Sequence, residues 1–559
     1  MFKLTIFCLF IWILNVNSFP HENFKSDDEL VVTLNHGGKV RGTEETTDAG
    51  QKFLSFKGIP YAKPPVGDLR LRNTQPHPGW AGTRDATKHG SNCIGQQMFS
   101  ESVTGSEDCL FLNVYVPRLE SKEKLPVMFW IHGGSFKSGS GDSEYYGPEF
   151  FMEEEVVIVT INYRLGFLGF FSTNDKAAQG NYGLKDCVEA LKWVQNNIEA
   201  FGGDREQVTI FGESAGGASV HYLTLSPMAN GLFRAAISQS GSALNPWSFQ
   251  DDPKRIAYEA GTFLNLTFSN TEELVKGIRE IDDPKIFVKF VGVAEDNQLP
   301  AFLQPIPFSP CVEPEDSEET RFLTETPLTI IQEKKFNKNI KYISGSNDKE
   351  MLLGIPQLNA NPNFLQKLNE NPHFLLPYEW HIDPDSEAAA DIIDNIRKVY
   401  FHGQNITDTM DFIKYSTDRV FGYGIQKTAQ LHSQSHEVFY YIFSFGGDLN
   451  IFKKLASLEQ YEGAAHADEL GYLWNFKALP SVSAESPAAT VRTRMVKMWS
   501  NFGKFGNPTP EQSELNVIWS NLQSNLEYLN IDGDLESKED PFSKRMAMWR
   551  EMDQKYNKK

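Results

Sequence analysis

A pentapeptide in the middle of the chain has the residue types of a nucleophilic site. Residues 212–216 read Gly-Glu-Ser-Ala-Gly, between a strand-like apolar run at 207–211 and a segment with helical potential at 220–223. A serine on a sharp strand-to-helix turn has its hydroxyl pushed clear of the backbone, and flanking glycines permit the turn. Glycine and serine are common residues, so the pattern alone is weak. The prediction that Ser214 is a nucleophile therefore depends on residues elsewhere in the chain.

Ser214 needs a base because a serine hydroxyl is a poor nucleophile at neutral pH, and the base needs an orienting acid. In one known arrangement the chain order is serine, acid, histidine. His466 is the favoured base because its small neighbours in Gly463-Ala464-Ala465 leave the imidazole accessible, although an ordinary surface-loop histidine has similar neighbours. The histidines beyond residue 350 are His373, His381, His402, His432, His436 and His466.

The acid is expected in a loop at the end of a strand. Residues 340–344 predict that strand, and the loop after it carries both Asp348 and Glu350. Either carboxylate qualifies from the residues alone, and a solvated loop charge is the alternative for each.

Acyl transfer also needs hydrogen-bond donors for an oxyanion that develops in the transition state. Residues 132–136 read His-Gly-Gly-Ser-Phe and directly follow a strand predicted at 127–131. A glycine pair there lets backbone N–H groups point inward, so Gly134 and Ser135 are expected to donate, with Ala215 as the third donor. An ordinary glycine-rich turn is the alternative.

The elements that must position these residues alternate along the chain. Apolar runs without strict alternation predict strands buried on both faces, and an amphipathic helix is expected at 184–198. This order predicts an α/β fold with a mostly parallel sheet and covering helices. A small antiparallel ribbon is expected from residues 35–41 and 52–56, and helical insertions at 245–335 and 350–435. The other strands are predicted at 156–161, 207–211, 235–238, 438–443 and 528–531.

Composition and the chain start bear on location and partners. The 559 residues are 40% hydrophobic, and a formal charge of −20 argues against nucleic acid or an anionic membrane as a partner. Lys3, the apolar run 4–14 and the small residues that follow predict a signal peptide at 1–18, with a single domain at 19–559; a buried N-terminal helix is the alternative. The polar end of the chain shows no lipid-anchor pattern. Secretion to the extracellular fluid is expected, which permits a Cys93–Cys109 disulfide and glycosylation at the sequons of Asn265 and Asn405.

Taken together, these motifs resemble the type-B carboxylesterase/lipase (cholinesterase-like) family, in particular secreted insect carboxylesterases, from about residue 28 to 550. The resemblance implies an α/β-hydrolase fold with helical insertions over the active site. The motifs that carry it are FKGIPYA at 56–62, EDCLFLN at 107–113, HGGSF at 132–136, NYRLG at 162–166, FGGD at 201–204 and GESAGG at 212–217.

The resemblance also assigns site residues. The family spacing from Gly345 selects Glu350 as the acid, and the Gly-x-x-His pattern selects His466 as the base. By the same likeness Ser240 supports the acid, Glu213 lies next to the nucleophile, and Trp247 lines the acyl pocket, although a plain core aromatic is the alternative for Trp247. The Cys93–Cys109 pairing matches the family, as do the implied ion pairs Arg70–Glu107 and Arg164–Asp186.

The function implied is a serine carboxylesterase that splits small-molecule esters through an acyl-enzyme, with no metal or cofactor and with the oligomeric state left open. A juvenile-hormone esterase or lipase specialisation is one alternative, and a non-catalytic binding protein on the same fold is another. Ser135 replaces a glycine of many relatives, and we hypothesise that it narrows or polarises the pocket. The disulfide loop has no tryptophan for a choline cage, which argues against acetylcholine, and Glu213 stands where juvenile-hormone esterases usually carry glutamine. Activity is expected to fall as the pH drops through about 6–7, where His466 would protonate.

Overall fold

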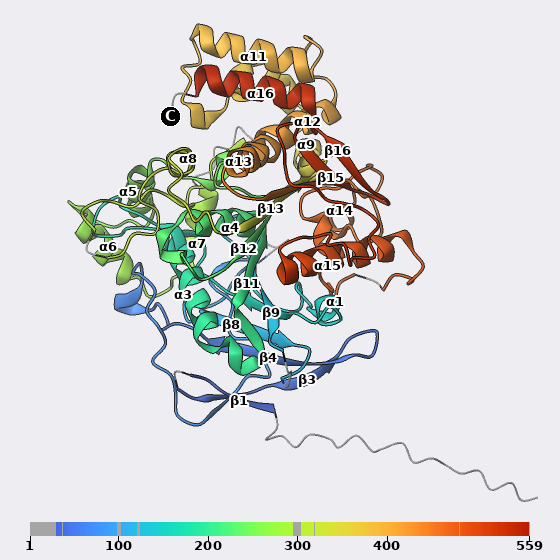
Figure 1. Cartoon of the computed structure of the whole chain (residues 1–559). Helices are drawn as coiled ribbons and strands as arrows, with labels where there is room; N and C mark the ends of the chain where they lie inside the picture. Colours follow the sequence, from blue (N-terminus) through green and yellow to red (C-terminus); the bar gives the residue numbers. More distant parts are fainter. Residues whose placement is uncertain are drawn as a thin grey trace, which may run out of the picture.

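A central sheet of eleven strands runs through the part of the chain that the computed structural model describes (Figure 1). That part is residues 30–557 without 36, 98–101, 120–122, 294–302, 318 and 480, so the signal peptide expected at 1–18 lies outside the described residues. The strand order is β16-β15-β14-β13-β12-β11-β9-β10-β8-β4-β3. The strands are β1 (Val31–Thr33), β2 (Lys39–Arg41), β3 (Thr43–Thr46), β4 (Lys52–Pro60), β5 (Thr83–Asp85), β6 (Gly95–Gln96), β7 (Val103–Thr104), β8 (Phe111–Val116), β9 (Leu125–Ile131), β10 (Val157–Ile161), β11 (Gly203–Glu213), β12 (Ala235–Gln239), β13 (Lys341–Asn347), β14 (Val438–Phe443), β15 (Glu527–Ile531) and β16 (Leu535–Glu539).

Pairing is parallel from β15 through β14, β13, β12, β11 and β9 to β10, and antiparallel at both ends of the sheet. The predicted mostly parallel sheet is therefore confirmed, as are its seven predicted strands, with small shifts of their ends. Because parallel strands share a direction, the carboxyl ends of β11, β12, β13 and β14 lie at one edge, where ligand sites form in such sheets.

The expected antiparallel ribbon of residues 35–41 and 52–56 is wrong. Strand β2 pairs with β1 and β5 in a separate sheet of three strands, whereas β4 joins the large sheet between β3 and β8. β4 is nine residues long and almost wholly buried, and an apolar strand of this kind gains more by pairing inside the main sheet than in an exposed hairpin.

Helices cover both faces of the sheet, and the two faces have separate cores. Along β9, Val127 and Phe129 point into the core shared with α3 and α4, and Met128 and Trp130 point into the core shared with α1 and α15. Residues 350–435 are largely helical, as predicted, and carry α9–α13, whereas the described residues of 245–335 carry α5–α8 separated by irregular segments and are less helical than predicted (Figure 1). The helices are α1 (Glu149–Met152), α2 (Gly166–Phe170), α3 (Tyr182–Asn197), α4 (Ala215–Leu225), α5 (Pro253–Phe263), α6 (Thr271–Arg279), α7 (Ile286–Val293), α8 (Pro327–Gln332), α9 (Ile355–Ala360), α10 (Phe364–Glu370), α11 (Glu387–Tyr400), α12 (Thr409–Thr417), α13 (Tyr423–Ser433), α14 (Ile451–Leu455), α15 (Pro487–Phe505) and α16 (Ser543–Tyr556).

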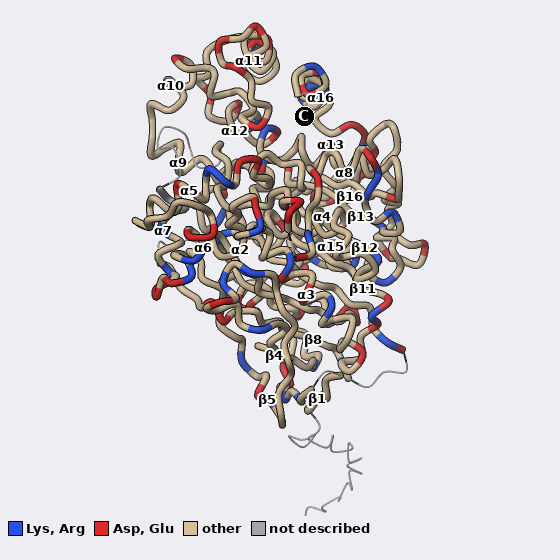
Figure 2. The backbone as a smooth tube through the Cα atoms, turned by 90° about the vertical axis from the view of Figure 1, so that its left-hand side faces the viewer, with Lys and Arg blue, Asp and Glu red and all other residues tan. Residues whose placement is uncertain are grey.

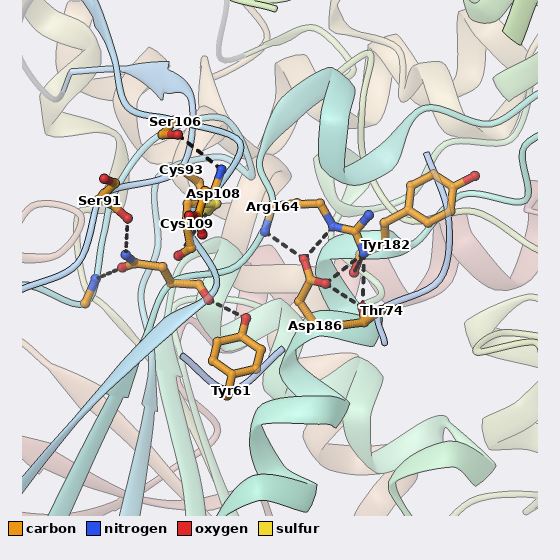
Figure 3. Close-up of a disulfide and its surroundings, with 12 residues drawn as sticks. Tyr61, Thr74, Ser91, Cys93, Ser106, Asp108, Cys109, Arg164, Tyr182 and Asp186 are labelled. Carbon is orange, nitrogen blue, oxygen red and sulfur yellow. Dashed lines mark hydrogen bonds and ion pairs between the residues drawn. A yellow bond between two sulfur atoms is a disulfide. The ribbon is translucent and has the colours of Figure 1, made fainter. Parts of the chain in front are cut away.

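The disulfide and two ion pairs expected from the sequence are present. Cys93 and Cys109 are bonded, and Figure 3 shows them near the Arg164–Asp186 pair, whose Nη2 and Oδ1 atoms are 2.8 Å apart. The side chains of Arg70 and Glu107 are also paired, with 2.7 Å between Nε and Oε1. The disulfide and the Arg70–Glu107 pair fix the segment that leads into β8, and the Arg164–Asp186 pair fixes the segment that follows β10.

Surface features agree with the composition. Acidic and basic residues are interspersed along the chain rather than separated into halves (Figure 2). Asn265 and Asn405 are both exposed. Within the described residues, no helix combines the length and the apolar character that crossing a membrane requires.

A chain of three histidines joins α4 to α13. Nδ1 of His221 accepts the N–H of Ala243 at 3.0 Å, so this ring carries its proton on Nε2 and donates it to Nε2 of His432 at 2.8 Å. His432 then donates from Nδ1 to Nε2 of His436 at 3.2 Å. Burial lowers the pKa of His221 to about 3 and that of His436 to about 4. The three imidazole rings are therefore neutral near pH 7. A proton added to any of them would be buried, with no negative charge among these rings to balance it.

These depressed pKa values make the fold sensitive to acid. In the unfolded chain a histidine has a pKa near 6.5 and takes up a proton below that pH, which the buried ring cannot do. The contribution of each buried ring to the free energy of unfolding is therefore fully present above pH 6.5 and is lost as the pH falls below it, by about 1 kcal/mol per ring at pH 5.5. In His436→Gln the amide oxygen accepts from His432 and does not titrate. We expect urea unfolding at pH 7.5 and pH 5.5 to show a smaller loss in this variant than in wild type by about 1 kcal/mol. An equal loss, or the same reduction in the exposed control His402→Gln, would contradict this.

Candidate active site

Ser214 lies on the sharp turn between β11 and α4. Its backbone has φ 57° and ψ −123°, and its N–H donates to the carbonyl oxygen of Gln239 at 2.8 Å. A Cβ on Gly216 would lie 2.0 Å from the carbonyl oxygen of Ile131, and one on Gly212 would lie 2.6 Å from the same atom. The flanking glycines are thus required by the close approach of β9, and the turn directs the Ser214 hydroxyl away from the sheet.

The structure brings Ser214, His466 and Glu350 into one hydrogen-bonded line. Ser214 Oγ is 2.9 Å from His466 Nε2, and His466 Nδ1 is 2.7 Å from Glu350 Oε2. Glu350 is fully buried, and its other oxygen accepts the hydroxyl of Ser240 at 2.6 Å and the N–H of Asn347 at 2.8 Å. Nδ1–H of His466 therefore points to the carboxylate, which leaves Nε2 as the acceptor for the serine proton.

The acid that the residues left open is distinguished by geometry. Asp348 Oδ1 accepts the N–H of Ala464 at 2.8 Å, in the loop before His466, whereas Glu350 contacts the imidazole itself. Among the six histidines beyond residue 350, all of them within the described chain, His466 alone hydrogen-bonds to Ser214.

The glycine-rich loop after β9 lies against the nucleophile. A Cβ on Gly133 would be 3.1 Å from Cβ of Ser214. Gly134, Ser135 and Phe136 all have positive φ, and among the described residues the N–H groups of Gly134 and Ser135 have no protein acceptor. Ala215 is the first residue of α4, where N–H groups lack a partner within the helix. The N–H groups of Gly134 and Ser135 are thus without a protein acceptor in a loop that reaches Ser214, and that of Ala215 follows Ser214 directly.

Three buried carboxylates surround His466. Glu213 Oε1 is 3.2 Å from His466 Nε2, and Glu469 accepts from Gln239 at 3.1 Å and from Asn347 at 2.7 Å. Burial raises the pKa of Glu213 above its ordinary value, and burial raises the pKa of Glu469 to about 7. Burial alone lowers the pKa of His466, but Glu213 and Glu350 outweigh it and raise that pKa. Loss of activity through histidine protonation is therefore expected at higher pH than the ordinary value suggests.

Sequence reasoning missed Glu469 and an aromatic cover over the imidazole. Glu469 lies three residues after His466, at the start of a short 3-10 helix (Asp468–Tyr472), and its closeness in sequence was its only signal. The ring of Phe421 lies 4.5 Å from that of His466, and it comes from a π-helical turn at Asp418–Gly422 that no sequence pattern marked. Trp247 packs between the rings of Phe421 and Phe136, at 5.8 Å and 6.2 Å.

A small cavity lies beside Trp247 and is mainly apolar. It is lined by Pro246, Leu303, Phe374, Leu376, Tyr415 and Val420, among others. Within the described residues, no group of three or more His, Cys, Asp or Glu side chains is arranged to hold a metal ion.

The site has a strained serine at the carboxyl edge of a mostly parallel sheet. The serine is hydrogen-bonded to a histidine, and the histidine is hydrogen-bonded to a buried carboxylate. This combination defines a serine-type α/β-hydrolase. Comparison with known proteins agrees. The model of the carboxylesterase family matches residues 28–549. Juvenile hormone esterase of Tribolium castaneum is 37% identical over 506 residues, which is 87% of this chain and 84% of that protein. Esterase E4 of Myzus persicae is 36% identical over 508 residues and 88% of each chain.

A crystal structure of juvenile hormone esterase from Manduca sexta, with OTFP covalently attached, superimposes with a TM-score of 0.83 at 30% identity and covers 94% of this chain and 99% of that one. The chain belongs to the carboxylesterase family. It is a serine hydrolase that acts on carboxylic esters.

The Glu213 carboxylate provides a direct test of the electrostatics. In Glu213→Gln the negative charge 3.2 Å from Nε2 is removed, so the pKa of His466 should fall, by about one unit or more. NMR titration of ¹⁵N-histidine-labelled enzyme would follow the His466 ring nitrogens in wild type, in Glu213→Gln and in the exposed control Glu206→Gln. An unchanged or higher pKa in Glu213→Gln would refute this account.

Proposed function

We propose that Ser214 attacks the ester carbonyl while His466 takes its proton, and that Glu350 orients and stabilises the imidazolium. The observation that carries this proposal is the continuous contact Ser214 Oγ–His466 Nε2–Glu350, with distances of 2.9 Å and 2.7 Å. General-base catalysis needs such a distance between nucleophile and base. The alcohol then leaves with the proton from His466, and water repeats the steps to release the acid from the acyl-enzyme.

In this proposal the N–H groups of Gly134, Ser135 and Ala215 bind the oxyanion. Their support is their position beside Ser214 and, for the two loop residues, the lack of a protein acceptor among the described residues. Such donors act where charge develops, and losing one costs about 3–4 kcal/mol of transition-state stabilisation in comparable sites. Ser240 acts on the reaction through Glu350, and Glu213 through the charge it places beside His466.

The surroundings of Trp247 bear on the acyl group of the substrate. The indole Nε1–H donates to the carbonyl oxygen of Val420 at 3.0 Å, so the rest of the ring presents apolar surface. The cavity beside it has a volume of about 10 Å³, room for about one water molecule, and its lining includes Arg419 beside apolar and aromatic side chains. The cavity is therefore too small to hold an acyl chain, and we propose only that Trp247 forms part of the apolar wall that faces the acyl group of a small-molecule ester.

A more specialised function is juvenile hormone hydrolysis. It is favoured by the 37% identity to the Tribolium castaneum enzyme and the 0.83 TM-score to the Manduca sexta enzyme. Comparing the kcat/KM for juvenile hormone with those for simple aryl esters separates this specialisation from a general esterase.

We also propose that residues 1–18 are a signal peptide and that 19–559 form one catalytic domain, secreted and glycosylated at Asn265 and Asn405. The apolar run 4–14 and the exposure of both asparagines support this. The charge of −20 supports the absence of a nucleic-acid or membrane partner.

Labelling with a fluorophosphonate tests the nucleophile. Wild type should bind one probe per chain, and Ser214→Ala should bind none, because the probe forms a bond to the activated serine oxygen. The matched control is Ser219→Ala on the same helix, whose hydroxyl donates to the carbonyl oxygen of Ala215. If Ser214→Ala and wild type were labelled equally, the result would contradict the proposed mechanism.

Ser135→Gly tests the hypothesis about pocket size. Ser135 has φ 54°, a conformation that costs a non-glycine residue about 1–2 kcal/mol, and glycine costs about 0.5–1 kcal/mol in chain entropy. The free energy of unfolding should therefore change by less than about 1 kcal/mol. The kcat/KM for branched or long acyl esters should rise relative to that for acetate esters. The same ratio in variant and wild type would show that Ser135 does not restrict the pocket.

A further inference from the structure

The loop that bears His466 has no regular secondary structure, yet its backbone N–H groups from 464 to 466 are all bonded, two of them to the segment of Asp348 and Glu350 and one to Asp468, three residues further along the loop. Two of the acceptors are carboxylates. The bonds are Ala464 N–H to Asp348 Oδ1 at 2.8 Å, Ala465 N–H to Asp468 Oδ2 at 2.7 Å, and His466 N–H to the carbonyl oxygen of Glu350 at 3.0 Å.

The carbonyl groups of the same loop are also satisfied. Their donors come from α14 and from the segment that carries Glu350, so the loop and the acid are tied together. The bonds are Lys453 Nζ to Gly463 O at 2.7 Å, Lys349 N–H to Ala464 O at 3.1 Å, and Asn347 Nδ2 to Ala465 O at 2.6 Å.

Asp348 also explains the glycine three residues before His466. Gly463 has φ 82°, and a Cβ there would lie 2.6 Å from Oδ2 of Asp348. The carboxylate therefore fills the space that a side chain at 463 would need. The Gly-x-x-His spacing has a physical cause in this chain, which is the packing of Asp348 against the loop.

The network is built from buried charges. Lys453 is 3% exposed and Asp468 is fully buried. Burial raises the pKa of Asp348 and of Asp468 to about 6 each, while the N–H bonds and Lys453 oppose that rise. Asp468 offsets the cost of its burial with three hydrogen-bond donors, whereas Asp348 is only partly buried and accepts one.

We propose that Asp348, Asp468 and Lys453 are positioning residues that hold the imidazole of His466 in reach of both Ser214 and Glu350. The proposal rests on the proposed function of those three residues. None of the positioning residues touches the Ser214–His466 contact. Their effect is on the backbone that carries the imidazole, and a displacement of about 1 Å can cost about 100-fold in rate.

Substitution by asparagine should preserve the hydrogen bond at position 348 but not all of those at position 468. Asp348 accepts one N–H, on Oδ1 alone, so Asp348→Asn can keep that bond with its amide oxygen. Asp468 accepts on both oxygens, from Lys453 N–H at 3.1 Å on Oδ1, and from Ala465 N–H and Asn450 Nδ2 on Oδ2. In Asp468→Asn the amide NH₂ must face one of these donors.

The test compares Asp348→Ala, Asp348→Asn and Asp468→Asn in the full-length enzyme, with Asp252→Ala as the matched control. Asp252 is an exposed aspartate that also accepts a backbone N–H, from Arg255. The measurements are kcat and KM on an aryl ester, the rate and final stoichiometry of fluorophosphonate labelling, and the thermal midpoint. We expect Asp348→Ala and Asp468→Asn to lose about 10- to 100-fold in kcat and in labelling rate, with KM and final stoichiometry kept. Asp348→Asn and Asp252→Ala should stay within about threefold of wild type.

Wild-type kcat in both Asp348→Ala and Asp468→Asn would overturn the proposal. An equal loss of kcat in Asp348→Asn and Asp348→Ala would also overturn it. So would a lower labelling stoichiometry with a lower thermal midpoint in all three variants, because those results indicate a general structural role. Failure of the proposed function is distinguishable, since it would appear as labelling of wild type that does not depend on Ser214.

Discussion

The close approach of three backbone segments at Ser214 is the constraint on which the rest of the site depends. A Cβ on Gly216 would lie 2.0 Å from the carbonyl oxygen of Ile131, and one on Gly241 would lie 2.0 Å from that of Ser214. Such distances leave no room for a side chain, so the end of β9, the start of α4 and the segment after β12 meet as bare backbone. The glycine-rich loop 132–136 continues from β9 and Ser240 directly follows β12, and both are therefore fixed relative to Ser214.

The same burial sets the electrostatics of the base. Removing His466 from water lowers its pKa, and the carboxylates of Glu213 and Glu350 raise it. The carboxylates outweigh the burial, so the net effect raises the pKa of His466 to about 9. Burial also limits the carboxylates themselves, since it raises the pKa of Glu469 to about 7 and that of Glu213 above its ordinary value. Charge around the imidazole is thus adjusted by opposing effects within one buried cluster.

Sequence patterns predicted what is local and repeated, and they failed where partners are distant. The buried strands, the turn at Ser214 and the glycine-rich loop were found because each has a short signature. The predicted ribbon is wrong because closeness in sequence favours pairing of residues 35–41 with 52–56, whereas β4 pairs with β8, more than fifty residues later. Asp348 and Glu350 remained equivalent until family spacing was used, because the direction of a side chain in a turn depends on contacts with residues 110 or more positions away.

One π-helical turn contacts both Trp247 and His466. At Asp418–Gly422 the widened helix frees carbonyl oxygens, and those of Val420 and Phe421 accept Asn245 Nδ2 at 2.9 Å each, with Val420 also accepting Trp247 Nε1 at 3.0 Å. The segment that carries Trp247 is therefore bonded to the turn that places Phe421 over His466. A substitution that moves Trp247 removes a contact of this turn, and through the turn it reaches the packing of the His466 imidazole.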